Sequence, residues 1–156
     1  MLRATTIKRK GEISAGRVAD TVHLAYRDRR RRRIVLTGER GTIFLLDLPQ
    51  AITLKDGDGL VLDNGAIVCV VGKPEALVEV AAASASDLAR LAWHIGNRHG
   101  DVQVIGDKLR ILRDHVLEDM LRALGATLTP IEAPFDAEPG AYGHGRAHAA
   151  GQDHDA

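Results

Sequence analysis

Histidine is the residue type whose placement most directly suggests chemistry in this sequence. The chain has 156 residues and seven histidines. One pair lies in the segment Trp-His-Ile-Gly-Asn-Arg-His at residues 93–99, and His144, His148 and His154 lie near the C-terminal end. Neutral imidazole is a ligand for nickel, copper, zinc and iron. The histidines therefore predict a metal site, which the rest of the chain has to position.

The last residue of that segment, His99, is the main candidate ligand. A helix that begins near Ser84 and ends at Gly100 would place His99 eleven residues after Leu88, which at about 100° per residue is nearly the same face. His94 points elsewhere. His99 would then extend a stripe of apolar residues formed by Leu88, Leu91, Ala92 and Ile95.

Gly96, one turn before His99, suggests how a single histidine can become a site. A glycine inside a helix costs about 1 kcal/mol relative to alanine, so Gly96 is expected to allow another backbone to approach closely. A two-fold dimer whose axis passes this helix end would bring His99 beside its own copy. We therefore predict a metal ion shared between two subunits. The alternative is a histidine that caps the helix or packs in an interface.

The other histidines are weaker candidates. The tail that carries His144, His148 and His154 is rich in Gly, Ala and Asp and is too polar to form a core. Its histidines can capture a metal ion weakly; the competing interpretation is an inert, solvated tail. His115, at the first position of a second helix, is either a further ligand or a solvated side chain, and His23 is expected to be an ordinary strand residue. A site that is half fixed and half mobile suits delivery better than catalysis.

The first 74 residues predict a small all-β domain. Val22, Leu24 and Tyr26 alternate with polar or small residues, and residues 42–46 form an apolar run between turn residues. The Asp-Asn-Gly sequence at residues 63–65 predicts a type I′ hairpin, which requires positive φ at both central residues.

Residues 75–135 predict a second domain of different pattern. Strands are expected at residues 77–82, 102–105, 108–112 and 126–131, and helices from Ser84 to Gly100 and from Asp114 to Gly125. The second helix should bury Val116, Leu117, Met120, Leu121 and Leu124. The order β-α-β-β-α-β is ferredoxin-like, with two helices on one face of a sheet. The predicted fold class is α+β, and residues 136–156 are expected to be a disordered, His-containing tail.

Composition and motifs exclude several classes of function. The chain is 45% hydrophobic, but it has no apolar run near the roughly 20 residues of a membrane helix and no signal core, so we expect a cytoplasmic protein. The single cysteine, Cys69, excludes a disulfide framework and is expected to be buried and inert. No phosphate loop, H-E-x-x-H or G-x-S-x-G motif is present, so we do not expect an enzyme.

Five consecutive arginines at residues 29–33 admit a different class of function. Such a run could neutralise phosphates and bind nucleic acid in a salt-dependent way. No aromatic platform accompanies it, however. We expect a charged hairpin between two strands that can meet an acidic protein surface.

The histidine segment resembles the signature of the urease accessory protein UreE family, the nickel metallochaperones of urease maturation. Residues 93–99 resemble the family's aromatic-His-Leu-Gly-Asn-Arg-His sequence. Residues 114–121, followed by Leu-Gly at 124–125, resemble its second helix, and residues 134–142 resemble the join to its His-rich tail. Residues 38–46 and the region of Asp58 are similar to its N-terminal domain. Arg113 stands where some members carry histidine, and this tail holds three histidines where some members have long polyhistidine tails.

The resemblance implies a fold, a cargo and partners. It implies an N-terminal domain similar to peptide-binding domains of chaperones, and a homodimer that binds Ni(II) between its subunits on His99, assisted by tail histidines. The implied partners are the GTPase UreG and the urease apoprotein with its other accessory proteins. Zn(II) or Cu(II) should also bind in vitro, because donor type alone does not select nickel. The alternative is a peptide-binding assembly adaptor for which metal binding is incidental.

Overall fold

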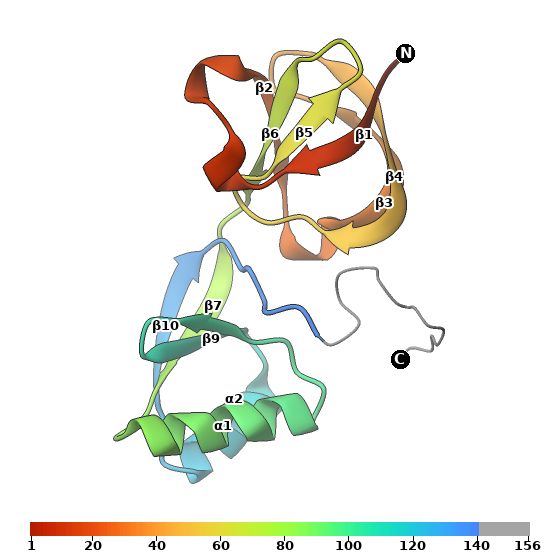
Figure 1. Cartoon of the computed structure of the whole chain (residues 1–156). Helices are drawn as coiled ribbons and strands as arrows, with labels where there is room; N and C mark the ends of the chain where they lie inside the picture. Colours follow the sequence, from red (N-terminus) through yellow and green to blue (C-terminus); the bar gives the residue numbers. More distant parts are fainter. Residues whose placement is uncertain (141–156) are drawn as a thin grey trace. The chain divides into compact units, whose positions relative to one another are not determined.

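The structure, a computed structural model, describes residues 1–140 of the chain. These residues are mostly strands, with two α-helices, which confirms the predicted α+β class. They contain two compact units, Met1–Lys73 and Pro74–Glu138 (Figure 1). No helix in this described part has the length and apolar character needed to cross a membrane.

The first unit is built from strands. Its six strands form one sheet in the order β2-β6-β5-β1-β4-β3. They are β1 (Leu2–Lys8), β2 (Val18–Leu24), β3 (Arg30–Thr37), β4 (Ile43–Thr53), β5 (Gly59–Leu62) and β6 (Ile67–Gly72). Fully buried side chains, among them Phe44, Leu46, Leu60 and Val68, form one apolar core. Tyr26, which we expected to continue a strand, lies in a short 3-10 turn at Tyr26–Asp28.

The hairpin predicted at residues 63–65 joins antiparallel strands β5 and β6. Its turn type differs from the prediction, because Gly65 has a positive φ of 88° and Asn64 does not. Asn64 Oδ1 instead accepts a hydrogen bond from the main-chain N–H of Ala66 at 2.9 Å. The Asn side chain thus stabilises the loop by a side-chain bond, and only its glycine needs the left-handed conformation.

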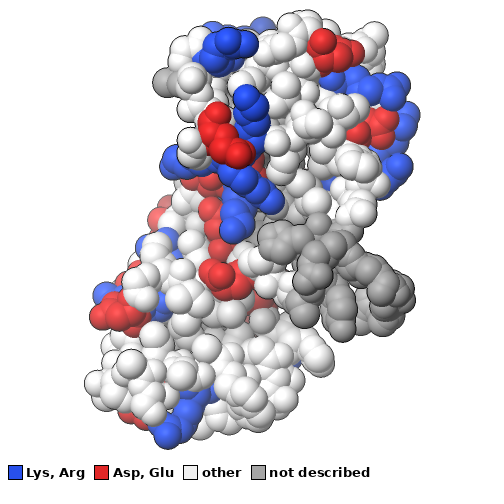
Figure 2. All heavy atoms as spheres, viewed as in Figure 1, with Lys and Arg blue, Asp and Glu red and all other residues white. Residues whose placement is uncertain are grey.

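The arginine run begins a strand, so the prediction of a charged hairpin is wrong. Arg29 is fully buried, and the next residue opens β3 at the edge of the sheet. Arg33 pairs with Asp47 at 3.2 Å. On the face seen in Figure 2, basic side chains of the first unit are interspersed with acidic ones. Charged residues on an edge strand hinder pairing with another chain, which accounts for arginines in this position.

The second unit has the element order β-α-β-β-α-β that the sequence predicts. Its elements are β7 (Glu75–Ala81), α1 (Ala85–Asn97), β8 (Gln103–Ile105), β9 (Lys108–Leu112), α2 (His115–Ala123) and β10 (Thr127–Ala133). The strands form an antiparallel sheet in the order β10-β7-β9-β8. Both helices lie on one side of this sheet (Figure 1). Leu91 and Ile95 of α1 and Leu117 and Leu121 of α2 pack there against apolar residues of β7 and β9.

Helix α2 buries fewer residues than predicted. Val116 is 61% exposed and Leu124 is 45% exposed, whereas Leu117 and Leu121 are buried. The helix has only nine residues, so one narrow stripe of residues three or four apart faces the sheet. Val116 lies beside that stripe, and Leu124 is the C-cap after the last turn.

Three residues that we assigned to the start of the tail, 136–138, are held on the second unit. The N–H of Asp136 donates to Gln103 Oε1 at 3.2 Å, and the N–H of Glu138 donates to the carbonyl of Val102 at 2.7 Å. These bonds connect the segment to β8 and the residue before it. The tail histidines His144, His148 and His154 lie outside the described residues.

Candidate metal centre

Helix α1 positions the histidine segment. Its N-cap is Ser84, whose hydroxyl accepts a hydrogen bond from the N–H of Asp87 at 3.1 Å. The Asp87 carboxylate lies in the first turn, where it interacts favourably with the helix dipole. Leu91 and Ile95 are buried against the sheet. The N-cap and the buried face are those that the sequence predicts. The start of the helix and the face that it turns toward the sheet therefore follow from residues recognisable in the sequence.

The end of α1 differs from the prediction. The helix ends at Asn97 and not at Gly100. His99 has a φ of 60° and is the only non-glycine residue with positive φ among residues 1–140. The N–H of His99 donates to the carbonyl of Gly96, and the N–H of Gly100 donates to the carbonyl of Ile95, both at 2.9 Å. These two bonds define a Schellman motif, in which His99 occupies the position that glycine usually takes.

Helix α2 ends in the same motif and provides an internal comparison. The N–H of Gly125 donates to the carbonyl of Arg122, and the N–H of Ala126 donates to the carbonyl of Leu121, both at 3.0 Å. The residue in the left-handed conformation is Gly125, with a φ of 92°. One unit therefore contains two equivalent helix ends, one closed by glycine and the other by His99.

A histidine in this position carries backbone strain. The left-handed conformation costs an L-residue about 1–2 kcal/mol, although histidine tolerates it better than most residue types. Gly100 stands after the strained residue because a Cβ there would lie 2.9 Å from Ile95 Cγ2. His99 leaves the helix and its side chain is exposed. The prediction that His99 extends the buried apolar stripe is therefore wrong, and the chain turns its imidazole away from the core.

The surface of the last turns of α1 is open and partly apolar. Trp93 is 62% exposed, and its ring lies edge-on to that of His94, with 5.1 Å between centroids. A Cβ added to Gly96 would meet no atom within 4 Å. The close approach that we expected at Gly96 therefore does not occur within residues 1–140, and a second molecule has room to approach there.

The end of α1 meets the beginning of α2 at a shallow hollow of about 270 Å³. It is lined by Arg98, Gly100, Asp114, Val116 and Leu117. The lining residues include both neighbours of His99 in the sequence. The main chain of His99 therefore lies next to this hollow, whose lining has both charged and apolar side chains.

Glu118 fixes the α2 side of this hollow, a role that the sequence analysis did not identify. Its buried carboxylate accepts hydrogen bonds from Arg113 Nε at 3.1 Å and from the N–H of Asp114 at 2.9 Å. The hydrogen bond from Arg113 lowers the pKa of Glu118, burial opposes that shift, and the Asp114 N–H lowers the pKa further. In sequence Glu118 is an ordinary acid in a first helical turn. Only the fold shows that it is buried.

Among the other candidate donors, two histidines pair with carboxylates and the cysteine is poorly suited to a metal. His115 is 89% exposed and its Nε2 lies 3.4 Å from Asp119 Oδ2, while His23 pairs with Glu39 at 2.9 Å in the first unit. Burial raises the pKa of Cys69, and nearby carboxylates add to that effect, so its thiol is poorly suited to coordination. No group of three or more His, Cys, Asp or Glu side chains suited to a metal ion occurs in the described part of the chain. A preformed site of three or more such ligands around His99 is therefore not present among residues 1–140.

Comparison with known proteins identifies relatives over both units. A family model described as the C-terminal domain of the UreE urease accessory protein matches residues 75–156, and one described as its N-terminal domain matches residues 4–72. Two similar proteins, both named urease accessory protein UreE, come from Rhodopseudomonas palustris. The BisB18 protein is 49% identical over 142 residues, and the HaA2 protein is 53% identical over 133 residues. A Bradyrhizobium protein (strain BTAi1) of the same name is 48% identical over 153 residues.

These matches cover most of this chain and a smaller share of its relatives. They include 91%, 83% and 98% of this chain, in the order given above. They span 67%, 62% and 73% of the respective relatives. This chain therefore spans about two thirds of the length of these proteins.

Proposed function

The chain belongs to the UreE urease accessory protein family, and from this premise we propose that it is a nickel metallochaperone. It delivers Ni(II) for assembly of the urease active site. A urease accessory protein assists the maturation of an enzyme and is not itself an enzyme. The protein acts in the cytoplasm as a homodimer and binds the ion at the subunit interface through His99 of both subunits.

The tail and the partners complete this proposal. His144, His148 and His154 assist in coordination, and His115 is a weaker candidate because it lies exposed beside Asp119. The nickel ion is cargo, so a site that combines a fixed ligand with further donors from the tail suits both capture and release. The partners are the GTPase UreG and, through it, the urease apoprotein with its other accessory proteins.

The observation that carries the proposal is the backbone conformation of His99. Glycine would close α1 without strain, as Gly125 does in α2. Strained backbone conformations cluster at functional sites, and His99 is a strained residue with an exposed metal-binding side chain. The open space at Gly96 and the exposed ring of Trp93 support an interface at this end of α1.

Nickel calorimetry on wild type and His99→Ala, with light scattering to give the mass of each species, tests the proposal. We expect one tightly bound ion per wild-type dimer. His99→Ala should lose that ion and remain a dimer, because it removes ligands at the margin of the interface and none of its apolar contacts. Tight nickel binding unchanged in His99→Ala would contradict the assignment of His99.

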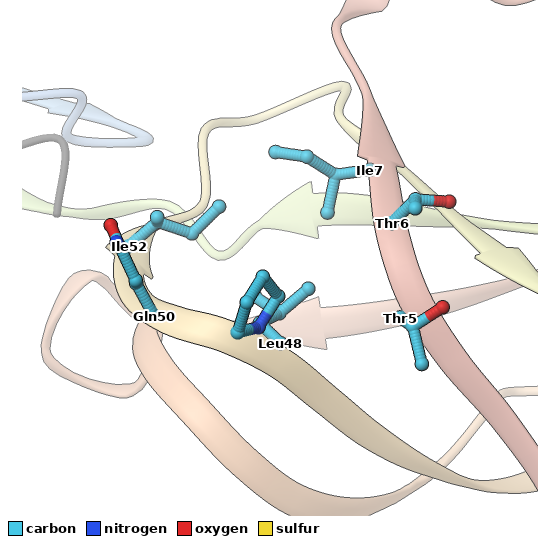
Figure 3. A pocket seen from close by; sticks show the side chains of 7 residues that line it. Thr5, Thr6, Ile7, Leu48, Gln50 and Ile52 are labelled. Atoms are coloured by element: carbon cyan, nitrogen blue, oxygen red, sulfur yellow. The ribbon is translucent and has the colours of Figure 1, made fainter. Parts of the chain in front are cut away.

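A peptide-binding assembly adaptor is the second candidate function. An apolar groove between β1 and β4 of the first unit favours it (Figure 3). Deleting residues 1–73 distinguishes the two functions. A metal carrier should keep its nickel and its dimer after the deletion, whereas an adaptor should lose its partner protein. Pull-down of the urease maturation proteins alongside calorimetry measures both properties.

A further inference from the structure

The segment after β10 (darker blue in Figure 1) is hydrogen-bonded to β8, the last strand of its sheet. The N–H of Glu138 donates to the carbonyl of Val102 at 2.7 Å, and the N–H of Val104 donates to Glu138 Oε2 at 3.2 Å. Main-chain groups at a sheet edge otherwise face solvent or a neighbouring strand. Glu138 thus supplies both the donor and the acceptor that a further strand would provide.

The residue between these two main-chain contacts, Gln103, holds the same segment through its side chain. Gln103 Oε1 accepts a hydrogen bond from the N–H of Asp136 at 3.2 Å. Phe135 is fully buried and Ala137 is 8% exposed, so the segment is packed as well as hydrogen-bonded. We call residues 135–138 with these three hydrogen bonds the tail clamp.

The tail clamp is close to His99. Val102 is three residues after His99 in the sequence, so their Cα atoms are at most about 11 Å apart. A hydrogen-bonded pair adds about 5.5 Å between Val102 and Glu138. The start of the tail is therefore fixed within about 17 Å of the main candidate ligand, and all of these residues belong to one compact unit.

The sequence beyond the tail clamp is long enough to bring a histidine back to that ligand. His144 is six residues after Glu138, and six residues span at most roughly 20–22 Å. With the clamp open, the last residue held in a strand is Ala133, eleven residues before His144. Because effective concentration falls as about the −3/2 power of loop length, lengthening the loop from six to eleven residues lowers it by roughly 2.5-fold.

We propose that Gln103 and Glu138 are positioning residues for nickel binding. They fix the start of the tail beside the end of α1, so that tail histidines meet the ion held by His99. Neither residue touches the metal. The inference rests on the proposed function and adds to it the part of the fold that joins the mobile ligands to the fixed one.

Nickel calorimetry on the full chain tests this in two backgrounds. The first is the wild-type chain. The second is a tail-histidine variant, which carries the three substitutions His144→Ala, His148→Ala and His154→Ala. In each background, the parent is compared with the same double substitution, Gln103→Ala with Glu138→Ala, which removes two of the three hydrogen bonds of the tail clamp.

Two further variants separate positioning from other roles. Glu138→Gln is the conservative variant, because its amide oxygen can still accept from the N–H of Val104. Glu132→Ala is the matched control, since Glu132 is an exposed acid of β10 outside the tail clamp. Hydrogen exchange of the Val104 N–H in metal-free protein reports opening of the clamp without reference to nickel. Light scattering and urea denaturation check the dimer and the fold of each variant.

We expect the double substitution to weaken nickel binding by about 2.5-fold or more in the wild-type chain. In the tail-histidine variant it should change the affinity by less than about 1.5-fold, because the residues act through the tail. Glu138→Gln and Glu132→Ala should each stay within about 1.5-fold of wild type. Exchange of the Val104 N–H should be faster in the double substitution than in wild type.

Four results would overturn the proposal. They are an unchanged nickel affinity in the double substitution, equal weakening in both backgrounds, a tail-histidine variant that binds nickel as tightly as wild type, and a loss in Glu138→Gln as large as that in the double substitution. The last would indicate that the carboxylate of Glu138 binds the ion itself. Failure of the metal site would look different, because His99→Ala would then keep its tight nickel ion.

Discussion

Replacing His99 with glycine should stabilise the fold while it removes the proposed nickel ligand. Relief of the left-handed conformation at φ 60° contributes about 1–2 kcal/mol. The greater freedom of glycine in the unfolded chain offsets roughly 0.5–1 kcal/mol of this. The net expectation for His99→Gly is a gain of about 0.5–1 kcal/mol in the free energy of unfolding. His99→Ala keeps the strain and should lie within about 0.5 kcal/mol of wild type.

Urea denaturation followed by circular dichroism measures these differences. It should be done in EDTA and at a single protein concentration, because a bound metal or a change in dimerisation would also shift stability. The reciprocal substitution, Gly125→His, introduces the same residue at the same position of the α2 motif. It should lower the free energy of unfolding by about 0.5–1 kcal/mol without affecting nickel binding.

Three results would refute this reasoning. The first is a His99→Gly variant that is less stable than wild type with an unchanged denaturant slope. The second is a His99→Gly variant no more stable than His99→Ala, because backbone strain would then not be what separates the two. The third is a His99→Gly variant that still binds one tight nickel ion per dimer. The backbone strain at His99 would then have no connection with nickel binding.

Other predictions follow from the same region and from the first unit. Gly96→Leu should leave the fold intact, since nothing lies within 4 Å of an added Cβ, but it should weaken the proposed dimer. If light scattering gives the variant the same mass as the wild-type dimer, Gly96 is not part of the interface. Glu118→Ala should lower the free energy of unfolding by about 2 kcal/mol in urea denaturation, because the main-chain N–H of Asp114 and the side chain of Arg113 both lose their acceptor. An unchanged denaturation midpoint would show that these hydrogen bonds do not stabilise the fold. Nickel affinity by calorimetry should fall below about pH 6, because a protonated imidazole cannot coordinate; undiminished affinity at pH 5 would exclude histidine as the main ligand. Burial alone would raise the pKa of Asp20, but hydrogen bonds from main-chain N–H groups, first that of Arg40, lower it from 3.8 to about 2. Its contribution to stability should therefore be present above about pH 4 and be lost as pH falls toward 2; Asp20→Asn should flatten acid unfolding in that window, and an unchanged acid transition would contradict this.

Most elements of both units could be predicted from local sequence because their signals are local. Hydroxyl and carboxylate caps at Ser84 and Asp114 begin the two helices, and the structure confirms both caps. Alternating apolar residues and apolar runs predicted strands of the first unit, for example at residues 22–24 and 42–46, although no strand was predicted over β1. The switch to helical spacing after residue 84 predicted the β-α-β-β-α-β order. Each of these features depends on side chains within a few residues of one another. The chain need not be folded for them to be recognised.

The site itself was only half predictable. Sequence singled out His99 by its residue type and its place at a helix end. It did not show which residue would adopt the left-handed conformation, because His99 and Gly100 were adjacent candidates and glycine is the usual choice. The structure places it at His99. Gly100 follows at a position where an added Cβ would lie 2.9 Å from Ile95 Cγ2, a contact between residues of the folded chain that the sequence does not show.

What the sequence alone determined was thus most of the elements, the N-caps of both helices and the identity of the main candidate ligand. Tertiary structure decided where side chains point and which of them are buried. It turned His99 out of the helix, buried Glu118 against Arg113, exposed Val116, and placed Arg29 in the interior of the first unit. It also separated β1 from β4 and so created a groove that no local pattern announces. The physical reason is that burial and strand register depend on residues far apart in the chain, whereas caps and periodicity depend on near neighbours.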